Sequence, residues 1–205
     1  MQKNIVPKAT LQRYPLYLKA LRLIKKEGIT KIMSKELSEY VSIESTTIRR
    51  DFSFIGRLGK QGFGYDVDSL ISIFEEQLGV NFDEKIILVG VGNLGKALLK
   101  YNKWNNVVGE IVCAFDRNPK RIKKLNIPVY DIKDIKKYMP EGCRIAILCI
   151  DKDLQKTVDL LQEAGIKGLV NFTSEHFIVN KNIKMKTISV VESIQELVFE
   201  TNNMN

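Results

Sequence analysis

The sequence is poor in the residues that bind metals or form disulfides. It has one histidine, His176, and three cysteines among 205 residues, and no two cysteines have the Cys-x-x-Cys spacing. Cys113 and Cys149 lie inside apolar runs, where cysteine usually acts as a small buried hydrophobic residue. A single histidine also excludes most zinc geometries. We therefore expect neither a disulfide framework nor a metal site.

Long apolar runs are also lacking. No run approaches the length of about 18 residues that a membrane-spanning helix needs, and the amino terminus has no signal-peptide core. The composition, with 44% hydrophobic and 27% charged residues, is typical of a globular protein in water. We expect a cytoplasmic protein without membrane contact, long enough for two modest domains.

Acidic residues are scarce in only one part of the chain. Residues 1–65 contain 13 Lys and Arg against 5 Asp and Glu, a net charge of +8, whereas residues 66–205 contain 19 of each. This asymmetry favours a basic domain that meets a polyanion, followed by a neutral domain with another task. The alternative is a basic surface that serves only solubility.

A glycine motif stands between an apolar run and a segment of helical composition. Lys85–Val89 is rich in β-branched residues and predicts a buried parallel strand, and Lys96–Tyr101 predicts the start of a helix. The motif between them is Gly90, Val91, Gly92, Asn93, Leu94 and Gly95. A strand, a glycine turn and a helix in this order predict a dinucleotide-binding site.

Each glycine of the motif has a specific role in such a site. Gly90 makes the tight turn, Gly92 lets a pyrophosphate approach the backbone, and Gly95 lets the helix pack closely on the strand. The free N–H groups of the helix N-terminus favour the phosphates. Asp116 ends a second apolar run about 20 positions further on, where an acid binds the adenosine ribose. The alternative is a glycine turn in a generic α/β domain with a solvated acid.

Residues 15–54 have the pattern of a helix-turn-helix. Thr10 is expected to cap a first helix, which Pro15 kinks or restarts and Gly28 ends, and Ser34 is expected to cap a short second helix. A third helix follows a turn, with Ile48 and Phe52 on its inner face. We expect its outer face to contact DNA through Ser45, Thr46, Thr47, Arg49 and Arg50.

Residues 56–65 predict a wing. The segment contains four glycines and two cations interleaved with large apolar residues, which suits a β-hairpin that passes close to a phosphate backbone. Lys60 and Gln61 are expected at its tip, in contact with DNA. The alternative is a flexible linker. A connecting helix is expected over residues 68–78.

Four motifs in one order resemble the Rex family of redox-sensing transcriptional repressors. The motifs are Arg49–Gly56, Gly62–Val67, Gly90–Gly95, and Ala164–Gly168 with Asn171 and Phe172. The resemblance covers nearly the whole chain. It implies a homodimer whose winged-helix domains read double-stranded operator DNA and whose Rossmann-like domains bind NAD(H), with NADH releasing the repressor.

The resemblance also implies a nicotinamide site near Tyr101, Cys149 and Ile150. Family members usually have Val-Pro where this chain has Ile150-Asp151, and a second aspartate two positions after Asp116, where this chain has Asn118. Arg117 stands between Asp116 and Asn118. It could stack on adenine or accommodate the 2′-phosphate of NADP.

The second half alternates strand and helix patterns, which predicts a doubly wound parallel sheet. A helix with a wide apolar stripe ends the chain, and such a stripe must be buried. The alternatives are burial on its own sheet and, as the resemblance implies, exchange with a second protomer. The expected domains are a winged-helix DNA-binding domain at 1–80, a Rossmann-like NAD(H)-binding domain at 81–188 and a dimerisation helix at 189–205.

Two functions remain open at this point. One is a repressor that senses the NADH/NAD⁺ ratio, and the other is a small NAD-dependent oxidoreductase with a basic accessory domain. An oxidoreductase needs a group that moves a proton, yet His176 is the only histidine, and Tyr101 and Tyr130 lack a lysine at the four-residue spacing of short-chain dehydrogenases. We therefore expect a protein that is not an enzyme.

Overall fold

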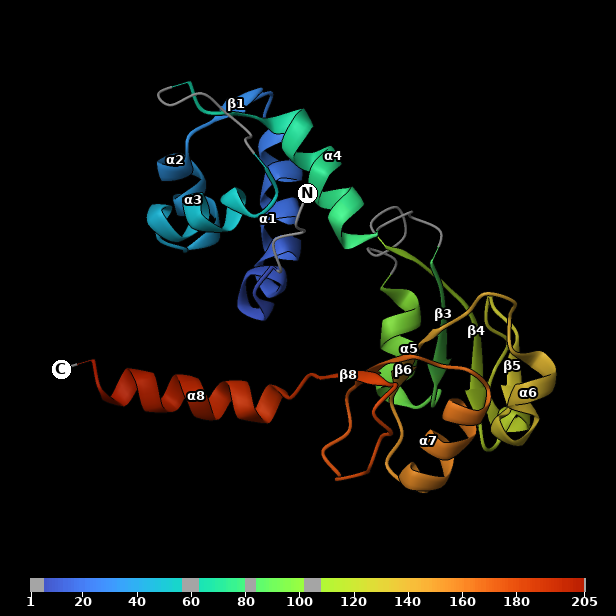
Figure 1. Ribbon diagram of the computed structural model, residues 1–205. Helices are drawn as coiled ribbons and strands as arrows, with labels where there is room; N and C mark the ends of the chain where they lie inside the picture. Colours follow the sequence, from blue (N-terminus) through green and yellow to red (C-terminus); the bar gives the residue numbers. More distant parts are fainter. Residues whose placement is uncertain (1–5, 57–62, 80–83, 102–107, 205) are drawn as a thin grey trace. The chain divides into compact units, whose positions relative to one another are not determined.

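The computed structural model describes residues 6–56, 63–79, 84–101 and 108–204 (Figure 1). The chain divides into two compact units, Met1–Asn81 and Phe82–Asn205. The first unit contains four helices and a short sheet among its described residues: α1 (Lys8–Lys26), β1 (Lys31–Ile32), α2 (Ser34–Val41), α3 (Ser45–Ser53), β2 (Tyr65–Asp66) and α4 (Val67–Leu78). The predicted order of three helices and a connecting helix is therefore observed.

Aromatic rings fill the core of the first unit. Tyr17 contacts Phe52 edge to face at a centroid distance of 5.3 Å, and Phe52 contacts Phe74 at 5.5 Å. These three rings come from α1, α3 and α4, so they fix α3 against α1 and α4. Ile48 and Phe52 point inward as the helical spacing predicts.

The start of α1 differs from the sequence prediction. The helix begins at Lys8 after Pro7, so Thr10 lies inside the helix and does not cap it. Pro15 neither breaks nor restarts the helix, because buried side chains precede it at Tyr14 and follow it at Tyr17, and their packing outweighs the lost backbone bond. Gly28 follows the helix end with φ +80°, as expected.

Two further local details were predicted differently. Ser34 is the first helical residue of α2, and the cap position is Met33, whose N–H donates to Glu36 Oε2 at 2.7 Å. β2 pairs antiparallel with β1, which precedes the second helix in the chain. The predicted wing tip, including Lys60 and Gln61, lies outside the described residues. Gly79 ends α4 in the left-handed region.

The second unit contains the predicted parallel sheet. Its strands are β3 (Glu84–Val89), β4 (Gly109–Asp116), β5 (Val129–Asp131), β6 (Ile145–Leu148), β7 (Gly168–Asn171) and β8 (Lys184–Thr187). They lie in the order β5-β4-β3-β6-β7-β8, and every neighbouring pair is parallel. From β3 the chain adds β4 and β5 on one side and then returns to add β6, β7 and β8 on the other side. The topological switch point therefore lies between β3 and β6. β8 was not predicted, because all four of its residues are exposed and carry no apolar pattern.

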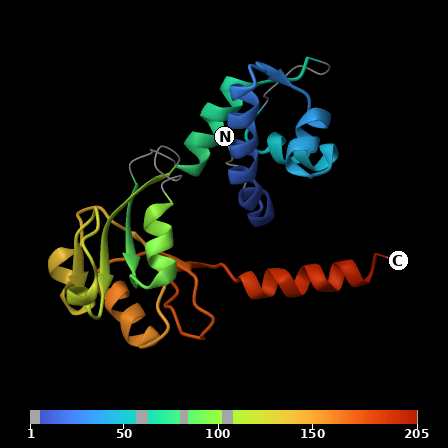
Figure 2. The ribbon, with the colours of Figure 1, turned by 180° about the vertical axis from the view of Figure 1, so that it is seen from behind.

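Helices cover both faces of this sheet (Figure 1 and Figure 2). One apolar cluster joins the sheet to α6 (Ile135–Tyr138) and α7 (Leu154–Glu163), and another joins it to α5 (Asn93–Lys100). Short 3-10 turns occupy Pro119–Arg121 and Ile132–Asp134. The predicted doubly wound α/β fold is confirmed.

The last helix, α8 (Val190–Asn202), has an uncovered apolar face. Ser189 caps it by accepting a hydrogen bond from the N–H of Glu192. None of its residues is buried, and Val190, Ile194 and Leu197 are 68%, 55% and 57% exposed. The stripe does not pack on the sheet of its own chain, which was one of the two expectations. Among the described residues, no helix combines the length and the apolar character needed to cross a membrane.

Candidate nucleotide site and nucleic-acid interface

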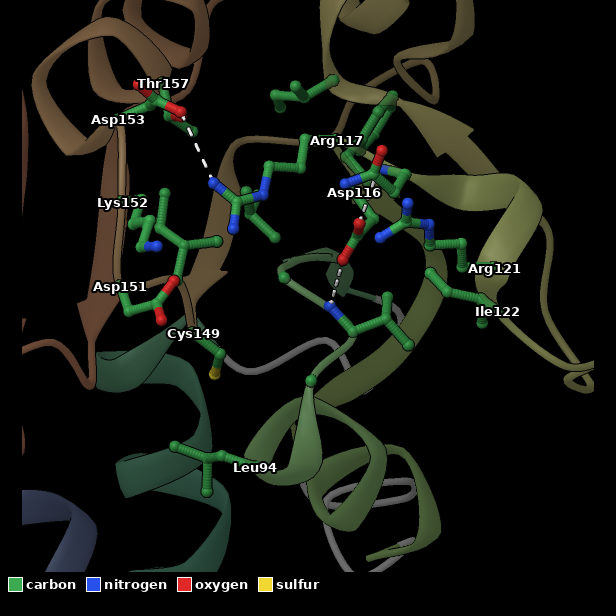
Figure 3. Close-up of a pocket in the computed structure, with 18 of the residues that line it drawn as sticks. Leu94, Asp116, Arg117, Arg121, Ile122, Cys149, Asp151, Lys152, Asp153 and Thr157 are labelled. Carbon is green, nitrogen blue, oxygen red and sulfur yellow. Dashed lines mark hydrogen bonds and ion pairs between the residues drawn. The ribbon is translucent and has the colours of Figure 1, made fainter.

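A cavity of about 630 Å³ opens at the carboxyl ends of β3, β4 and β6 (Figure 3). This is the switch point of the sheet, where open α/β proteins bind their ligands. Most of the predicted cofactor residues line it: Gly90, Val91, Gly92, Asn93, Leu94, Asp116, Arg117, Cys149 and Ile150. The sheet thus brings together residues that are up to 60 positions apart in the sequence.

Backbone contacts explain two of the three glycines. A Cβ atom on Gly90 would collide with the carbonyl oxygen of Cys149, and one on Gly95 would collide with the carbonyl oxygen of Gly90. Gly90 also has φ +94°, in the region that favours glycine. Gly92 has open space around it, so its backbone is accessible from the cavity. α5 begins directly after Gly92, and its first N–H groups are available to an anion.

Asp116 is held in place by the backbone. Its Oδ2 accepts from the N–H of Val91 at 2.9 Å, and its Oδ1 accepts from the N–H of Asn118 at 2.8 Å. Each oxygen keeps acceptor capacity after these bonds. A fixed carboxylate beside the glycine turn is the arrangement that binds a ribose diol.

The side chain of Arg117 points away from that of Asp116 and toward α7. Its Nη1 lies 3.6 Å from Oδ2 of Asp153, and both side chains are at least half exposed. Asp153 precedes α7, so this ion pair joins the loop after β4 to the start of α7, and both residues line the cavity. The nearby Cys149 thiol is half-buried, and its desolvation raises its pKa to about 11, so it is uncharged at neutral pH.

Sequence reasoning missed most of the positive charge around the cavity. Six cationic side chains against three carboxylates line it among the described residues. The five that were missed are Lys96, Arg121, Lys133, Lys152 and Lys156. They follow the carboxyl ends of parallel strands within a few positions or lie in the first turns of the next helices. That placement could have identified them, since such segments surround the ligand in this fold.

Two predicted cofactor residues do not line the cavity. Gly95 packs behind the turn against the backbone of Gly90. Tyr101 follows α5 at its far end and is 49% exposed. The only histidine of the sequence, His176, is exposed and also lies outside the cavity lining.

In the first unit, α3 presents the predicted polar face. Thr46, Arg49 and Arg50 are exposed, whereas Ser45 and Thr47 are half-buried. The Nη1 of Arg49 donates to the hydroxyl of Ser34 on α2 at 3.1 Å, which steadies its side chain beside the helix.

A buried aspartate holds α3 to α1. Asp51 is fully buried and accepts from the hydroxyls of Thr10 at 2.9 Å and Tyr17 at 2.6 Å. Arg13 donates to both of its oxygens, through Nε at 2.6 Å and Nη2 at 2.7 Å. Burial alone would raise the pKa of Asp51, but the hydrogen bonds from Arg13, Tyr17 and Thr10 outweigh burial and lower it below its ordinary value. Sequence reasoning missed this group.

The fold and the cavity together define a class: a helix-turn-helix domain followed by a Rossmann-like domain with a dinucleotide-type cavity. Two family models match in the same order, "Putative DNA-binding protein N-terminus" over residues 5–53 and "CoA binding domain" over residues 81–175. The redox-sensing transcriptional repressor Rex of Lysinibacillus sphaericus is 43% identical over 98% of both chains. Rex of Lactobacillus acidophilus is 40% identical over 97% of this chain and 96% of its own. The chain therefore belongs to the Rex family of redox-sensing transcriptional repressors.

Solved structures of the repressor RSP agree with this assignment. Its complex with NAD⁺ and operator DNA matches 97% of this chain and 94% of its own with a TM-score of 0.87 at 30% identity. Its complex with NADH matches with a TM-score of 0.83 at 28% identity, over 97% and 95% of the two chains.

Proposed function

We propose that this protein is a transcriptional repressor that binds operator DNA through its first unit and NAD(H) through its second, and that NADH releases it from DNA. The observation that carries the proposal is one chain with two sites, a glycine-lined cavity that holds Asp116 at a sheet switch point and an exposed basic helix in a separate unit. The RSP complex with NAD⁺ and operator DNA supports both partners.

The proposed cofactor site uses three parts of the cavity. The pyrophosphate lies over Gly92 and the N-terminus of α5, and Asp116 accepts from the adenosine ribose. The cationic excess around the cavity offsets the two negative charges of the pyrophosphate. The nicotinamide lies toward Cys149 and Ile150.

The proposed DNA interface is the exposed face of α3. Arg49 or Arg50 reaches base edges in the major groove, and the other contacts a phosphate. Lys60 and Gln61 of the wing remain proposed DNA contacts.

We also propose that α8 mediates a homodimer. Its apolar face is uncovered in the single chain, and an exposed apolar face of this kind favours burial against a partner. A second copy that covers this helix would bury the stripe. Sedimentation of the double variant Ile194→Asp/Leu197→Asp should give a monomer, whereas the control Glu196→Gln should stay dimeric.

The oxidoreductase alternative has no support from the cavity. Its lining includes neither a histidine nor a tyrosine among the described residues, so no such side chain is in place to move a proton. Because its relatives are transcriptional repressors, we propose a sensor without enzymatic activity, which works in the cytoplasm, where DNA and NAD(H) are both available.

The decisive experiment measures coupling between the two ligands. NADH affinity is measured by fluorescence with and without saturating operator, and operator binding is measured by gel shift with and without NADH. Since coupling is reciprocal, each ligand should weaken the other by the same factor, typically about 5- to 150-fold. NAD⁺ should couple less. An NADH affinity that operator DNA leaves unchanged would remove the sensor function and leave a DNA-binding protein with a structural nucleotide.

A further inference from the structure

The ion pair between Arg117 and Asp153 spans the cavity beside the proposed ribose site. Arg117 directly follows Asp116 in the sequence, yet the two side chains diverge. Figure 3 shows Asp116 pointing to the glycine turn and Arg117 reaching toward Asp153 at the start of α7. The 3.6 Å distance between Nη1 and Oδ2 places opposite charges in contact across the cavity.

Asp153 is unusual for a residue at its position. It is the N-cap residue of α7, where an aspartate normally accepts a hydrogen bond from the helix backbone. Here its side chain makes no such bond, and its backbone has φ +56°, in the left-handed region. The carboxylate is therefore not used for capping, and it is directed to Arg117.

This arrangement bears on the choice of cofactor. NADPH differs from NADH by a phosphate on the 2′ position of the adenosine ribose, the position next to the acid that ends the second strand. Asp116 repels that phosphate, and an arginine beside it can accommodate it through paired hydrogen bonds. Arg117 is the adjacent arginine, but its guanidinium is paired with Asp153.

We propose that Asp153 is a specificity-determining residue that favours NADH over NADPH by holding Arg117 away from the 2′ position of the adenosine ribose. The proposal rests on the proposed function, because it needs NAD(H) in this cavity. Asp153 acts on the cofactor through Arg117 and is a positioning residue.

The first test is Asp153→Asn. Asparagine tolerates the left-handed backbone as aspartate does, so the turn is retained while the ion pair is lost. With Arg117 released, NADPH affinity should rise about 2- to 5-fold, the range that corresponds to an exposed ion pair, and NADH affinity should stay within about 2-fold. Both reduced cofactors are followed by their fluorescence.

The matched control is Asp151→Asn. Asp151 lines the same cavity and carries the same charge, but it has no ion pair with Arg117. An equal rise in NADPH affinity in both variants would show an effect of net charge alone and would overturn the proposal. No rise in Asp153→Asn would overturn it as well.

A second variant keeps the proposal testable if Asp153→Asn folds poorly. Arg117→Leu should leave the ratio of NADPH to NADH affinity within about 2-fold of the original, because a held arginine does not serve the phosphate, and it should abolish the gain of Asp153→Asn in the double variant. A marked loss of NADPH affinity in Arg117→Leu alone would show that Arg117 already binds the phosphate and would overturn the proposal. A wild-type protein that binds neither cofactor would instead contradict the proposed function.

Discussion

Asp51 in the first unit and Asp116 in the second each accept several hydrogen bonds, and the two aspartates differ in the access that they leave to a ligand. Asp51 is fully buried, and three side chains from α1 occupy its oxygens. Asp116 is half-buried, and two backbone N–H groups fix it while it still lines a cavity. A carboxylate enclosed by its own chain stabilises the fold, whereas one fixed from behind and open in front is available to a ligand.

The largest effect should follow removal of the enclosed carboxylate. Asp51→Ala leaves Arg13 and Tyr17 without their acceptor, so the first unit should lose about 3 kcal/mol of its free energy of unfolding. Hydrogen exchange of the α1 and α3 amides would measure this loss, and gel shift should show weaker operator binding.

The control for this variant is Asp68→Ala in the same unit. Asp68 pairs with Lys25 at 2.6 Å, but both side chains are more than half exposed, so its removal should cost much less stability than Asp51→Ala. NADH affinity should be retained in both variants because the second unit has its own core. Equal losses of stability in Asp51→Ala and Asp68→Ala would contradict the special contribution of the buried Asp51 carboxylate.

Removal of the Asp116 carboxylate should weaken cofactor binding and leave the stability of the first unit unchanged. Asp116→Ala loses a charged acceptor for the ribose, and NADH affinity should fall by about 10-fold or more. The preference for NADH over NADPH should also decrease, since the charge that repels the 2′-phosphate is gone. The fluorescence of the two reduced cofactors measures both affinities. Asp151→Ala is the control in the same cavity, and a wild-type protein with equal affinity for the two cofactors would contradict the role of Asp116.

Substitution of the exposed arginines Arg49 and Arg50 tests whether α3, the helix that Asp51 holds in place, contacts the DNA bases. Arg49→Ala or Arg50→Ala, at whichever position reads a base, should weaken operator binding by about 1–3 kcal/mol and relax specificity at one base pair, without loss of stability. Gel shifts on operator variants measure this. Lys25→Ala removes an equal charge from α1 and serves as the control. Unchanged operator binding after removal of both arginines would exclude α3 as the reading helix.

The smallest effect concerns pH. Because the folded pKa of Asp51 is lowered, its contribution to stability is present above the unfolded value of about 4 and is lost as the pH falls through the folded pKa. Tyr17 acts at the other end, since burial and its bond to Asp51 raise its pKa above the ordinary value of about 10, and its contribution is lost as the pH rises through the folded pKa. The unfolding midpoint of the first unit should therefore change little with pH between about 4 and about 10. In Asp51→Asn, the midpoint should fall less steeply as the pH drops below about 4.

The sequence allowed prediction of features that depend on local spacing. The glycine motif, the acid at the end of β4 and the inward side of α3 follow from periodicities of two to four residues and from the chemistry of turns. The alternation of strands and helices was enough for the doubly wound sheet and for the edge at which the cavity opens.

Features that depend on distant partners escaped prediction. The burial of Asp51 depends on Thr10, Arg13 and Tyr17, which are 34 to 41 positions away in the sequence. Pro15 was expected to kink or restart the first helix, but α1 runs through it without a restart because side chains on both sides of it are buried. The pairing of Asp153 with Arg117 depends on how the loops after β4 and before α7 face each other.

The floor of the cavity has a mechanical consequence. At Gly90 the turn lies against the backbone of Cys149, directly after β6, and at Gly95 the start of α5 lies against the backbone of Gly90. Side chains can absorb a displacement by changing rotamer, whereas a stack of peptide groups can only move as one body. A load applied to the glycine turn is therefore transmitted to α5 and to the segment after β6 with little loss. Close backbone contact thus gives an occupant of the cavity a stiff path by which it can displace the elements around it.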